Sequence, residues 1–200
     1  MKNRAKYILR RPFVCILFLA SYLIGHLFYD GKYLTGQHFQ AWHLTAGWRW
    51  VLRYWFPQKI LGENRHVPWP VPPWVKIGDP KNIVFDPDDM HNFHGCGNYF
   101  QAGWGGKIVL GKGCYIAPGT GLINANHDLT DPDEHLPGKD IILGEGCWLG
   151  MNVVVLPGVT LGPHTSVGAG AVVTKSFPEG WCVIAGNPAR KIKEVPHERH

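Results

Sequence analysis

The stretch LGEGCWLGMNVVVLPGVTLGPHTSVGAGAVVT, residues 143–174, carries an aliphatic residue at every sixth position. The six are Leu143, Leu149, Val155, Leu161, Val167 and Val173. A period of six is typical of a β-solenoid, in which each unit contributes one short strand and one turn and three units complete a coil. The pattern therefore predicts an all-β solenoid, a parallel β-helix with these side chains pointing inward and stacking from coil to coil.

The same six-residue period also occurs upstream of this stretch, and it is interrupted once. Its upstream members are Leu110, Ile116 and Leu122 and, more weakly, Ile77 and Ile83. Between Asn126 and Ile142 acids, prolines and a glycine replace the aliphatic residues, so we expect residues 127–141 to form a loop that the solenoid extrudes. Exceptions to a repeat are often placed on the functional face. The β-helix is assigned to residues 77–178 and a C-terminal segment to residues 179–200.

Charge is distributed unevenly along the 200 residues, a length that suits one domain with a short appended segment. Lys and Arg number 20 against 15 Asp and Glu, but residues 2–11 hold five cations and no acid, so the rest balances. A nucleic-acid-binding domain would spread its basic residues over the fold, and we expect no such partner. The basic run favours an anionic membrane surface, with an ordinary solvated terminus as the alternative.

Two segments near the N-terminus predict helices. Phe13–Tyr29 has no formal charge and, at about 1.5 Å per residue, would reach roughly 25 Å, slightly short of a hydrocarbon core of about 30 Å. Phe39–Phe56 spaces its apolar and aromatic residues by three and four, as an amphipathic helix requires. We interpret residues 1–56 as a helical hairpin that dips into one membrane leaflet. Helices that pack against the protein itself, or a cleaved signal peptide, are the alternatives.

Prolines mark the boundary between these helices and the solenoid. His66–Trp74, HVPWPVPPW, cannot continue a helix because proline lacks the amide donor. The sequence therefore divides into a basic, hydrophobic and aromatic helical segment at residues 1–65 and a linker at residues 66–76, followed by the β-helix.

The five cysteines are odd in number and lack CxxC spacing, which indicates neither a disulfide framework nor a zinc ribbon. His91, His94 and Cys96 form an H-x2-H-x-C cluster in a turn-rich stretch without an obvious fourth ligand. We therefore expect no metal. Cys114 and Cys147 occupy the small inward position of the repeat, where a buried thiol acts as an apolar filler.

Four segments together resemble the left-handed β-helix acyltransferases, the hexapeptide-repeat family that includes galactoside, maltose, polysaccharide and xenobiotic O-acetyltransferases. The segments are INANHDLTDPD at 123–133, GCWLGMNVVVLPGVTLG at 146–162, VGAGAVVTK at 167–175 and GNPARKIK at 186–193. The resemblance implies left-handed winding, acetyl-CoA as acyl donor, and a homotrimer whose active sites lie between neighbouring subunits. The hydrophobic N-terminal segment departs from the soluble members.

The resemblance also implies roles for particular residues. His127 stands where the family places its catalytic histidine, which would take the proton of the acceptor hydroxyl as that oxygen attacks the acetyl carbonyl. The donor-binding residues implied are Trp148, Met151, Gly168, Ala169, Thr174, Lys175, Asn187, Pro188 and Arg190, with the amide near Met151 stabilising the oxyanion. The acceptor-binding residues implied are Asn98, Asn126 and Asp128.

These expectations favour an acetyl-CoA-dependent O-acetyltransferase for a saccharide, with a lipid-linked saccharide as one candidate, at the cytoplasmic face of the inner membrane, peripheral or monotopic. A soluble, cytoplasmic acetyltransferase for a small sugar, amino acid or xenobiotic is the alternative. A zinc-dependent β-helix hydratase would need an H-x4-H pair, which His127 and His135 do not supply.

Overall fold

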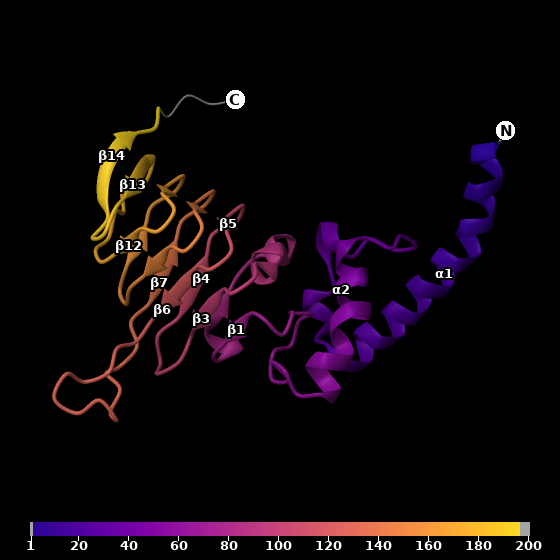
Figure 1. The fold of residues 1–200 in the computed structure, drawn as a ribbon, viewed down its shortest axis with the longest axis horizontal. Coiled ribbons are helices and arrows are strands. Elements are labelled where there is room, and N and C mark those ends of the chain that lie inside the picture. The colour runs from indigo at the N-terminus through magenta and orange to yellow at the C-terminus, as the bar shows by residue number, and fades with distance from the viewer. Residues whose placement is uncertain (1, 197–200) are drawn as a thin grey trace. The chain divides into compact units, whose positions relative to one another are not determined.

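The computed structural model describes residues 2–196, with side chains from residue 12 onward, and divides the chain into two compact units, Met1–Pro73 and Trp74–His200 (Figure 1). The boundary differs from the expected linker at residues 66–76. Val67, Trp69 and Val71 are fully buried within the first unit, so the proline-rich stretch is part of its core.

The second unit is a parallel β-solenoid with three faces (Figure 1). Sheet A has the strand order β1-β3-β6-β9-β12, sheet B the order β10-β7-β4-β2, and sheet C the order β14-β13-β11-β8-β5. From β3 to β12 the chain visits sheets A, B and C in turn, so three strands make one coil. Every pairing is parallel except that of β13 with β14, and the predicted parallel β-helix is confirmed.

The strands are short, as a hexapeptide unit requires. They are β1 (Lys76–Ile77), β2 (Ile83–Val84), β3 (Tyr99–Gln101), β4 (Ile108–Leu110), β5 (Tyr115–Ile116), β6 (Gly121–Ile123), β7 (Ile141–Leu143), β8 (Trp148–Leu149), β9 (Val154–Val155), β10 (Thr160–Leu161), β11 (Ser166–Val167), β12 (Val172–Val173), β13 (Cys182–Ala185) and β14 (Arg190–Glu194). The solenoid thus continues to β13, beyond the expected end at residue 178.

The core consists of the predicted inward residues. All six aliphatic residues of the 143–173 repeat are at most 2% exposed, and each is in register with its equivalent 18 residues away, as Leu143 is with Leu161. Cys114 and Cys147 are fully buried between coils, where their thiols donate to Gly144 O and Gly162 O at 3.2 Å. The thiols therefore act as small fillers with a local acceptor.

The extruded loop interrupts one coil without disturbing this register. Leu143 also pairs in register with Leu110, 33 residues earlier, although the regular spacing is 18. The difference is 15 residues, which leave the solenoid between β6 and β7. The loop comprises residues 124–140 instead of the expected 127–141, because Ile141 is fully buried at the start of β7.

The first coil lacks a strand in sheet C, and the 3-10 helix η5 (Pro87–His94) takes its place. Asn92 is completely buried there; its Nδ2 donates to Cys114 O at 2.9 Å and its Oδ1 accepts from Ile116 N at 2.8 Å. The side-chain amide thus satisfies the edge of β5, which would otherwise be an unpaired strand edge. A further 3-10 helix, η4 (Pro80–Asn82), precedes β2.

The first unit is helical. It contains α1 (Lys2–Phe28), η1 (Gly31–Tyr33), η2 (Gly36–His38), α2 (Ala46–Trp55) and the π-helical turn η3 (Phe56–Ile60). The second helix is shorter than the expected Phe39–Phe56, because Trp42 adopts a left-handed φ of 60° and Thr45 is extended before the first helical residue. The N-terminal helix is confirmed, while none of the helices in the described part of the chain has both the length and the hydropathy needed to cross a bilayer.

Single contacts hold the first unit together. The Trp48 ring packs edge-on against Phe18 and Phe39, with centroids 5.6 and 5.0 Å apart. Gln58 is 1% exposed; its Oε1 accepts from Tyr29 Oη at 3.0 Å and Val71 N at 3.1 Å, while its Nε2 donates to backbone carbonyls including Trp69 O at 3.0 Å. One buried amide in η3 therefore links the proline-rich stretch to Tyr29, the residue that follows α1.

Candidate active site

Hydrogen bonds at its base fasten the extruded loop to the connection between β3 and β4. Asn124 is buried and its Nδ2 donates to Gly103 O at 2.7 Å and Gly106 O at 2.8 Å. Gly138 N donates to Trp104 O at 2.7 Å, at the other side of the base. These bonds fix where the loop leaves the solenoid.

His127 lies on a short hairpin just beyond that base. Asp128 N donates to Glu134 O at 2.9 Å and Leu136 N donates to Asn126 O at 2.8 Å, which places His127 opposite His135. The His127 ring is exposed, and its Nδ1 lies 2.6 Å from Pro132 O. A carbonyl oxygen can only accept, so Nδ1 carries the proton in the neutral ring and Nε2 is left as a proton acceptor.

Asp128 shapes the tip of the loop. Its Oδ1 accepts from Thr130 N at 2.7 Å, Thr130 Oγ1 at 2.6 Å and Asp131 N at 3.2 Å. The hydrogen bonds from Thr130, followed by that from Asp131 N, lower the pKa of the Asp128 carboxyl. Asn126, beside His127, has an exposed side chain.

Asn98 is placed in the first coils, where its carboxamide has a structural role. It is 1% exposed, its Oδ1 accepts from Thr120 N at 3.1 Å, and its Nδ2 donates to Asn92 O at 3.4 Å. Its amide is occupied by the backbone and faces away from solvent, so the geometry offers no support for the expected contact with an acceptor.

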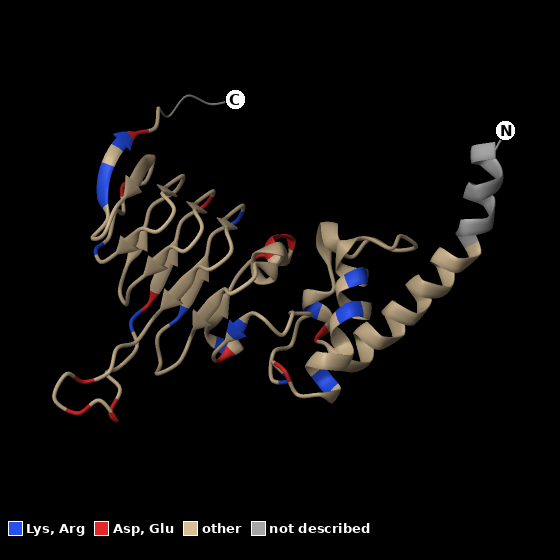
Figure 2. Cartoon of the chain, in the orientation of Figure 1, with Lys and Arg blue, Asp and Glu red and all other residues tan. Residues whose placement is uncertain are grey.

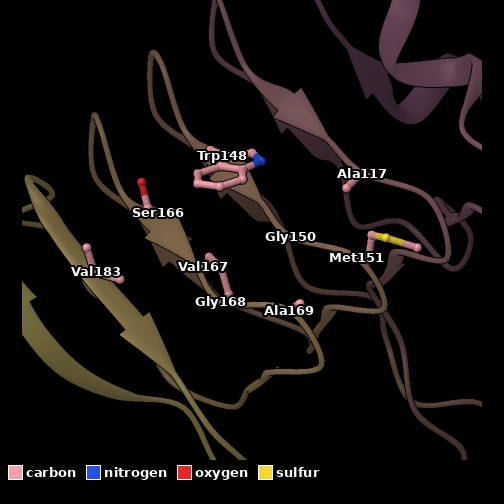
Figure 3. A pocket seen from close by; sticks show the side chains of 9 residues that line it. All are labelled: Ala117, Trp148, Gly150, Met151, Ser166, Val167, Gly168, Ala169 and Val183. Carbon is pink, nitrogen blue, oxygen red and sulfur yellow. The ribbon is translucent and has the colours of Figure 1, made fainter.

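A groove of about 290 Å³ lies over sheet C (Figure 3). Four predicted donor-binding residues line it together, namely Trp148, Met151, Gly168 and Ala169. The other lining residues are Ala117, Gly150, Ser166, Val167 and Val183. Ser166 and Val183 could have been found from the repeat, because Ser166 is the register partner of both Trp148 and Val183 on neighbouring strands.

Two backbone amides mark the turn end of this groove, where Figure 3 shows Met151 and Ala169. Within residues 2–196, neither Met151 N nor Ala169 N donates a hydrogen bond to the protein, whereas the neighbouring Gly150 N donates to Val167 O at 2.9 Å and Gly170 N donates to Met151 O at 2.8 Å. The turns therefore present unused donors beside an otherwise apolar groove.

The remaining predicted donor-binding residues lie outside the groove lining. Thr174 and Lys175 are exposed directly after β12, and Asn187 and Pro188 form the turn between β13 and β14. Arg190 opens β14, which carries three cations in five residues and pairs with β13 beside the groove residue Val183 (Figure 2). Positive charge thus lies one strand from the groove.

One chain holds His127 and the groove at different corners of the solenoid. The extruded loop leaves between sheets A and B, because it joins β6 to β7. Met151 and Ala169 lie on the turns that lead from sheet C to sheet A. The base candidate and the groove therefore do not face the same space within a single chain.

The described residues contain no group of three His, Cys, Asp or Glu side chains arranged to hold a metal ion. In the candidate cluster, the His91 ring packs instead on Tyr115, with centroids 5.0 Å apart. The chemistry available at the site is that of an imidazole base, backbone donors and an apolar groove.

The hexapeptide repeat of the solenoid is similar to that of known transferases. Residues 140–175 match the family model described as bacterial transferase hexapeptide (six repeats). The predicted resemblance to the hexapeptide-repeat acyltransferases is confirmed, since the relatives and solved structures described next, which are similar to part of this chain, are named acetyltransferases.

Three similar proteins illustrate the relationship. The galactoside O-acetyltransferase of Escherichia coli is 36% identical over 95 residues, 44% of each chain. A hexapeptide-repeat acetyltransferase of Vibrio cholerae O1 biovar eltor, solved with acetyl coenzyme A, is 27% identical with a TM-score of 0.53 over 62% of this chain and 66% of the other. A galactoside acetyltransferase solved with coenzyme A is 28% identical with a TM-score of 0.54 over 66% and 63%.

The chain spans 47%, 61% and 45% of the length of the first curated relatives it matches, each of which is named a putative acetyltransferase. Sequence similarity is thus concentrated in part of each protein.

Proposed function

We propose that this protein is an acetyl-CoA-dependent O-acetyltransferase that transfers an acetyl group to a saccharide hydroxyl. The observation that carries the proposal is the state of His127, whose Nδ1 is held by Pro132 O at 2.6 Å while Nε2 makes no hydrogen bond to the side chains and backbone described between residues 12 and 196. A ring held in this tautomer presents Nε2 as a proton acceptor. The similarity to galactoside O-acetyltransferases supports the reaction class.

In the proposed reaction His127 Nε2 takes the acceptor's hydroxyl proton as that oxygen attacks the thioester carbonyl. The C–S bond then breaks, and His127 returns the proton to the departing thiolate, so the enzyme ends unchanged. The N–H of Met151, which donates to none of the described residues, would stabilise the oxyanion formed in between. No acyl-enzyme is required.

The groove over sheet C is the proposed donor site. Gly168 and Ala169 allow the backbone to approach an extended pantetheine arm closely. Lys175 and Arg190, with Thr174, Asn187 and Pro188, would meet the phosphates and nucleotide end. The acetyl coenzyme A and coenzyme A bound to the two solved neighbours support this assignment.

Because one chain separates His127 from the groove, we propose a homotrimer in which each site combines His127 of one subunit with the groove of the next. A chain carrying His127→Ala mixed with a chain carrying Ala169→Trp should regain activity in mixed trimers, since one site type then has both intact parts. Complete absence of rescue, with mixing confirmed by mass spectrometry, would contradict the shared site.

The direct test of the base is His127→Ala. Turnover of acetyl-CoA with a galactoside acceptor should fall by about 10² to 10⁴-fold, while coenzyme A binding measured by calorimetry stays the same. Leu129→Ala is the matched control, because Leu129 lies on the same loop with 97% of its surface exposed. Near-normal turnover in the His127 variant would exclude the assignment.

We further propose that α1 holds the enzyme on the cytoplasmic face of the inner membrane. Its residues Phe13, Ile16, Leu19, Leu23 and Leu27 are between 47% and 75% exposed and fall on one stripe of the helix. The opposite stripe, with Ser21 and Gly25, packs within the first unit. An apolar stripe that follows a basic run fits an anionic lipid surface.

Flotation with anionic liposomes tests this proposal. A variant with Leu19, Leu23 and Leu27 all changed to Gln should remain folded, because these side chains are exposed, and should lose binding that resists high salt. Binding of the parent protein that disappears in salt would indicate the basic run alone. Failure of the parent protein to bind would favour a soluble enzyme acting on a small sugar, amino acid or xenobiotic.

A further inference from the structure

Three aromatic rings stack in series across the two loops that meet at the base of the proposed site. The His127 and His135 centroids are 4.0 Å apart at an interplanar angle of 45°. The His135 and Trp104 centroids are 3.9 Å apart and their rings are nearly parallel, at 7°. Two of the rings come from the extruded loop and the third from the connection between β3 and β4.

The backbone of Trp104 is held in an uncommon conformation. Its φ is +52°, in the left-handed region that a bulky residue rarely adopts, although Gly103 and Gly105 stand on either side. Its carbonyl accepts from Gly138 N at 2.7 Å, which ties this conformation to the base of the extruded loop. Such strain persists where the surrounding structure requires it and points to a functional constraint.

We propose that His135 and Trp104 are positioning residues for His127, an inference that rests on His127 being the general base. The hydrogen bond from Nδ1 to Pro132 O fixes one atom of the imidazole but leaves the ring free to swing about that bond. The His135 ring, with its centroid 4.0 Å away, limits this freedom. Trp104 in turn stacks on His135, so the orientation of the His127 ring depends on the connection between β3 and β4.

Positioning of this kind is needed because His127 is exposed on a loop. A catalytic group has to be held within about 0.5 Å and 10–20° of its productive geometry by neighbours whose own orientation is locked. Neither His135 nor Trp104 is required to exchange protons in this role. An aromatic ring without titratable atoms should therefore replace His135.

Nuclear magnetic resonance of the full chain labelled with 15N and 13C in histidine tests the proposal without an acceptor. The ring signals of His127 are assigned by their loss in His127→Gln. In the wild type they should report a single tautomer with the proton on Nδ1. In His135→Ala they should shift and broaden as the ring gains freedom to swing about its bond to Pro132 O, whereas His135→Phe should keep the wild-type signals.

Trp104→Ala, which keeps a non-glycine residue at the same φ, should loosen His127 in the same direction, and Trp104→Phe should do so less. The backbone amide of Gly138 reports whether the base of the loop is intact in each variant, because its bond to residue 104 is a main-chain bond. Leu129→Ala again serves as the control on the same loop.

Unchanged His127 ring signals in both His135→Ala and Trp104→Ala, with Gly138 protected, would overturn the proposal. Acetyl transfer to p-nitrophenyl β-galactoside adds a second readout, in which kcat should fall by about 10 to 10²-fold in His135→Ala at little changed KM and recover in His135→Phe. If the signals respond but activity is insensitive to His127 itself, positioning stands and the proposed base fails.

Discussion

The cores of the two units of this protein are built from different kinds of contacts. In the solenoid one aliphatic position recurs, and each inward residue stacks on its equivalent in the next coil, as Leu149 does on Val167. In the first unit each buried contact joins different chemical groups and occurs only once, as between the Gln58 side-chain amide and the Tyr29 hydroxyl. In a repeated core, every repeat in the sequence encodes the same packing arrangement. In a core of single contacts, each contact depends on one particular pair of residues.

The repeated core should fail most severely when a charge enters it. Leu161 is completely buried, at 0% exposed, and lies between the apolar residues Leu143 and Phe177. Leu161→Asp buries a carboxylate without a partner, and we expect a loss of more than about 4 kcal/mol in the free energy of unfolding of the solenoid. Denaturant unfolding followed by circular dichroism measures this loss.

Leu129→Asp provides the comparison, because Leu129 lies on the extruded loop at 97% exposure. Its effect should stay within about 0.5 kcal/mol. Equal effects of the two substitutions would show that the coils do not form the core described here.

The core of the first unit, in which each contact occurs only once, should be destabilised by the loss of a single polar side chain. Gln58→Ala removes the hydrogen bonds that the Gln58 side chain makes to the Tyr29 hydroxyl, the Val71 amide and several carbonyls in the interior. Each unsatisfied buried group costs about 1 to 3 kcal/mol, and with partial relaxation we expect the first unit to lose about 3 kcal/mol. Tryptophan fluorescence in a urea titration reports it, and exposed Gln40→Ala should leave the midpoint unchanged.

The same contrast explains what could be predicted from the sequence. Four residues of the groove were implied by the resemblance to the hexapeptide-repeat acyltransferases. The parallel β-helix and its inward residues follow from a period that the sequence repeats. The limits of the second helix and the burial of Val67, Trp69 and Val71 do not follow from it, because they depend on the φ of Trp42 and on the contacts of Gln58. The stack of Trp104 and His135 on His127 was missed for the same reason: it joins residues with no common spacing.

The extruded loop belongs to the solenoid but is held by contacts that each occur only once. Substitutions at Gly106 and Gly103 test whether the loop depends on these contacts. A Cβ at Gly106 would lie 2.7 Å from the backbone of Gly138 and Lys139, whereas nothing lies within 4 Å of one at Gly103. Gly106→Ala should therefore cost about 1 to 2 kcal/mol through overpacking. Gly103→Ala should be neutral or slightly stabilising.

Hydrogen exchange at the amide of Gly138 locates the effect. Faster exchange there in Gly106→Ala, with the coils still protected, would show that the loop detaches while the repeat persists. Equal exchange in the two glycine variants would instead mean that the loop does not rely on this close approach.

The smallest effect expected is a pH dependence confined to the first unit. Lys59 Nζ donates to Arg65 O at 2.9 Å and Val67 O at 2.6 Å and lies 4.9 Å from the Tyr29 ring centroid. Burial lowers the pKa of Lys59 to about 8, and burial also raises the pKa of Tyr29 above its usual value. Both shifts favour the neutral form of the side chain in the folded unit.

The two shifts act in opposite directions on stability. Between about pH 8 and the ordinary lysine pKa of about 10.4 the unfolded chain binds more protons at Lys59, so stability rises with pH. Above about pH 10 the unfolded chain loses the Tyr29 proton first, so stability falls. Since Lys59 is only half-buried, screening by solvent should keep the rise below about 1 kcal/mol. Urea midpoints of the first unit between pH 7 and 10 should increase in the wild type and stay level in Lys59→Met, whose unfolded and folded states bind no proton there. A rise that persists in Lys59→Met would assign it to another group, and a fall over this range would show that the ammonium is stabilised in the folded unit rather than desolvated.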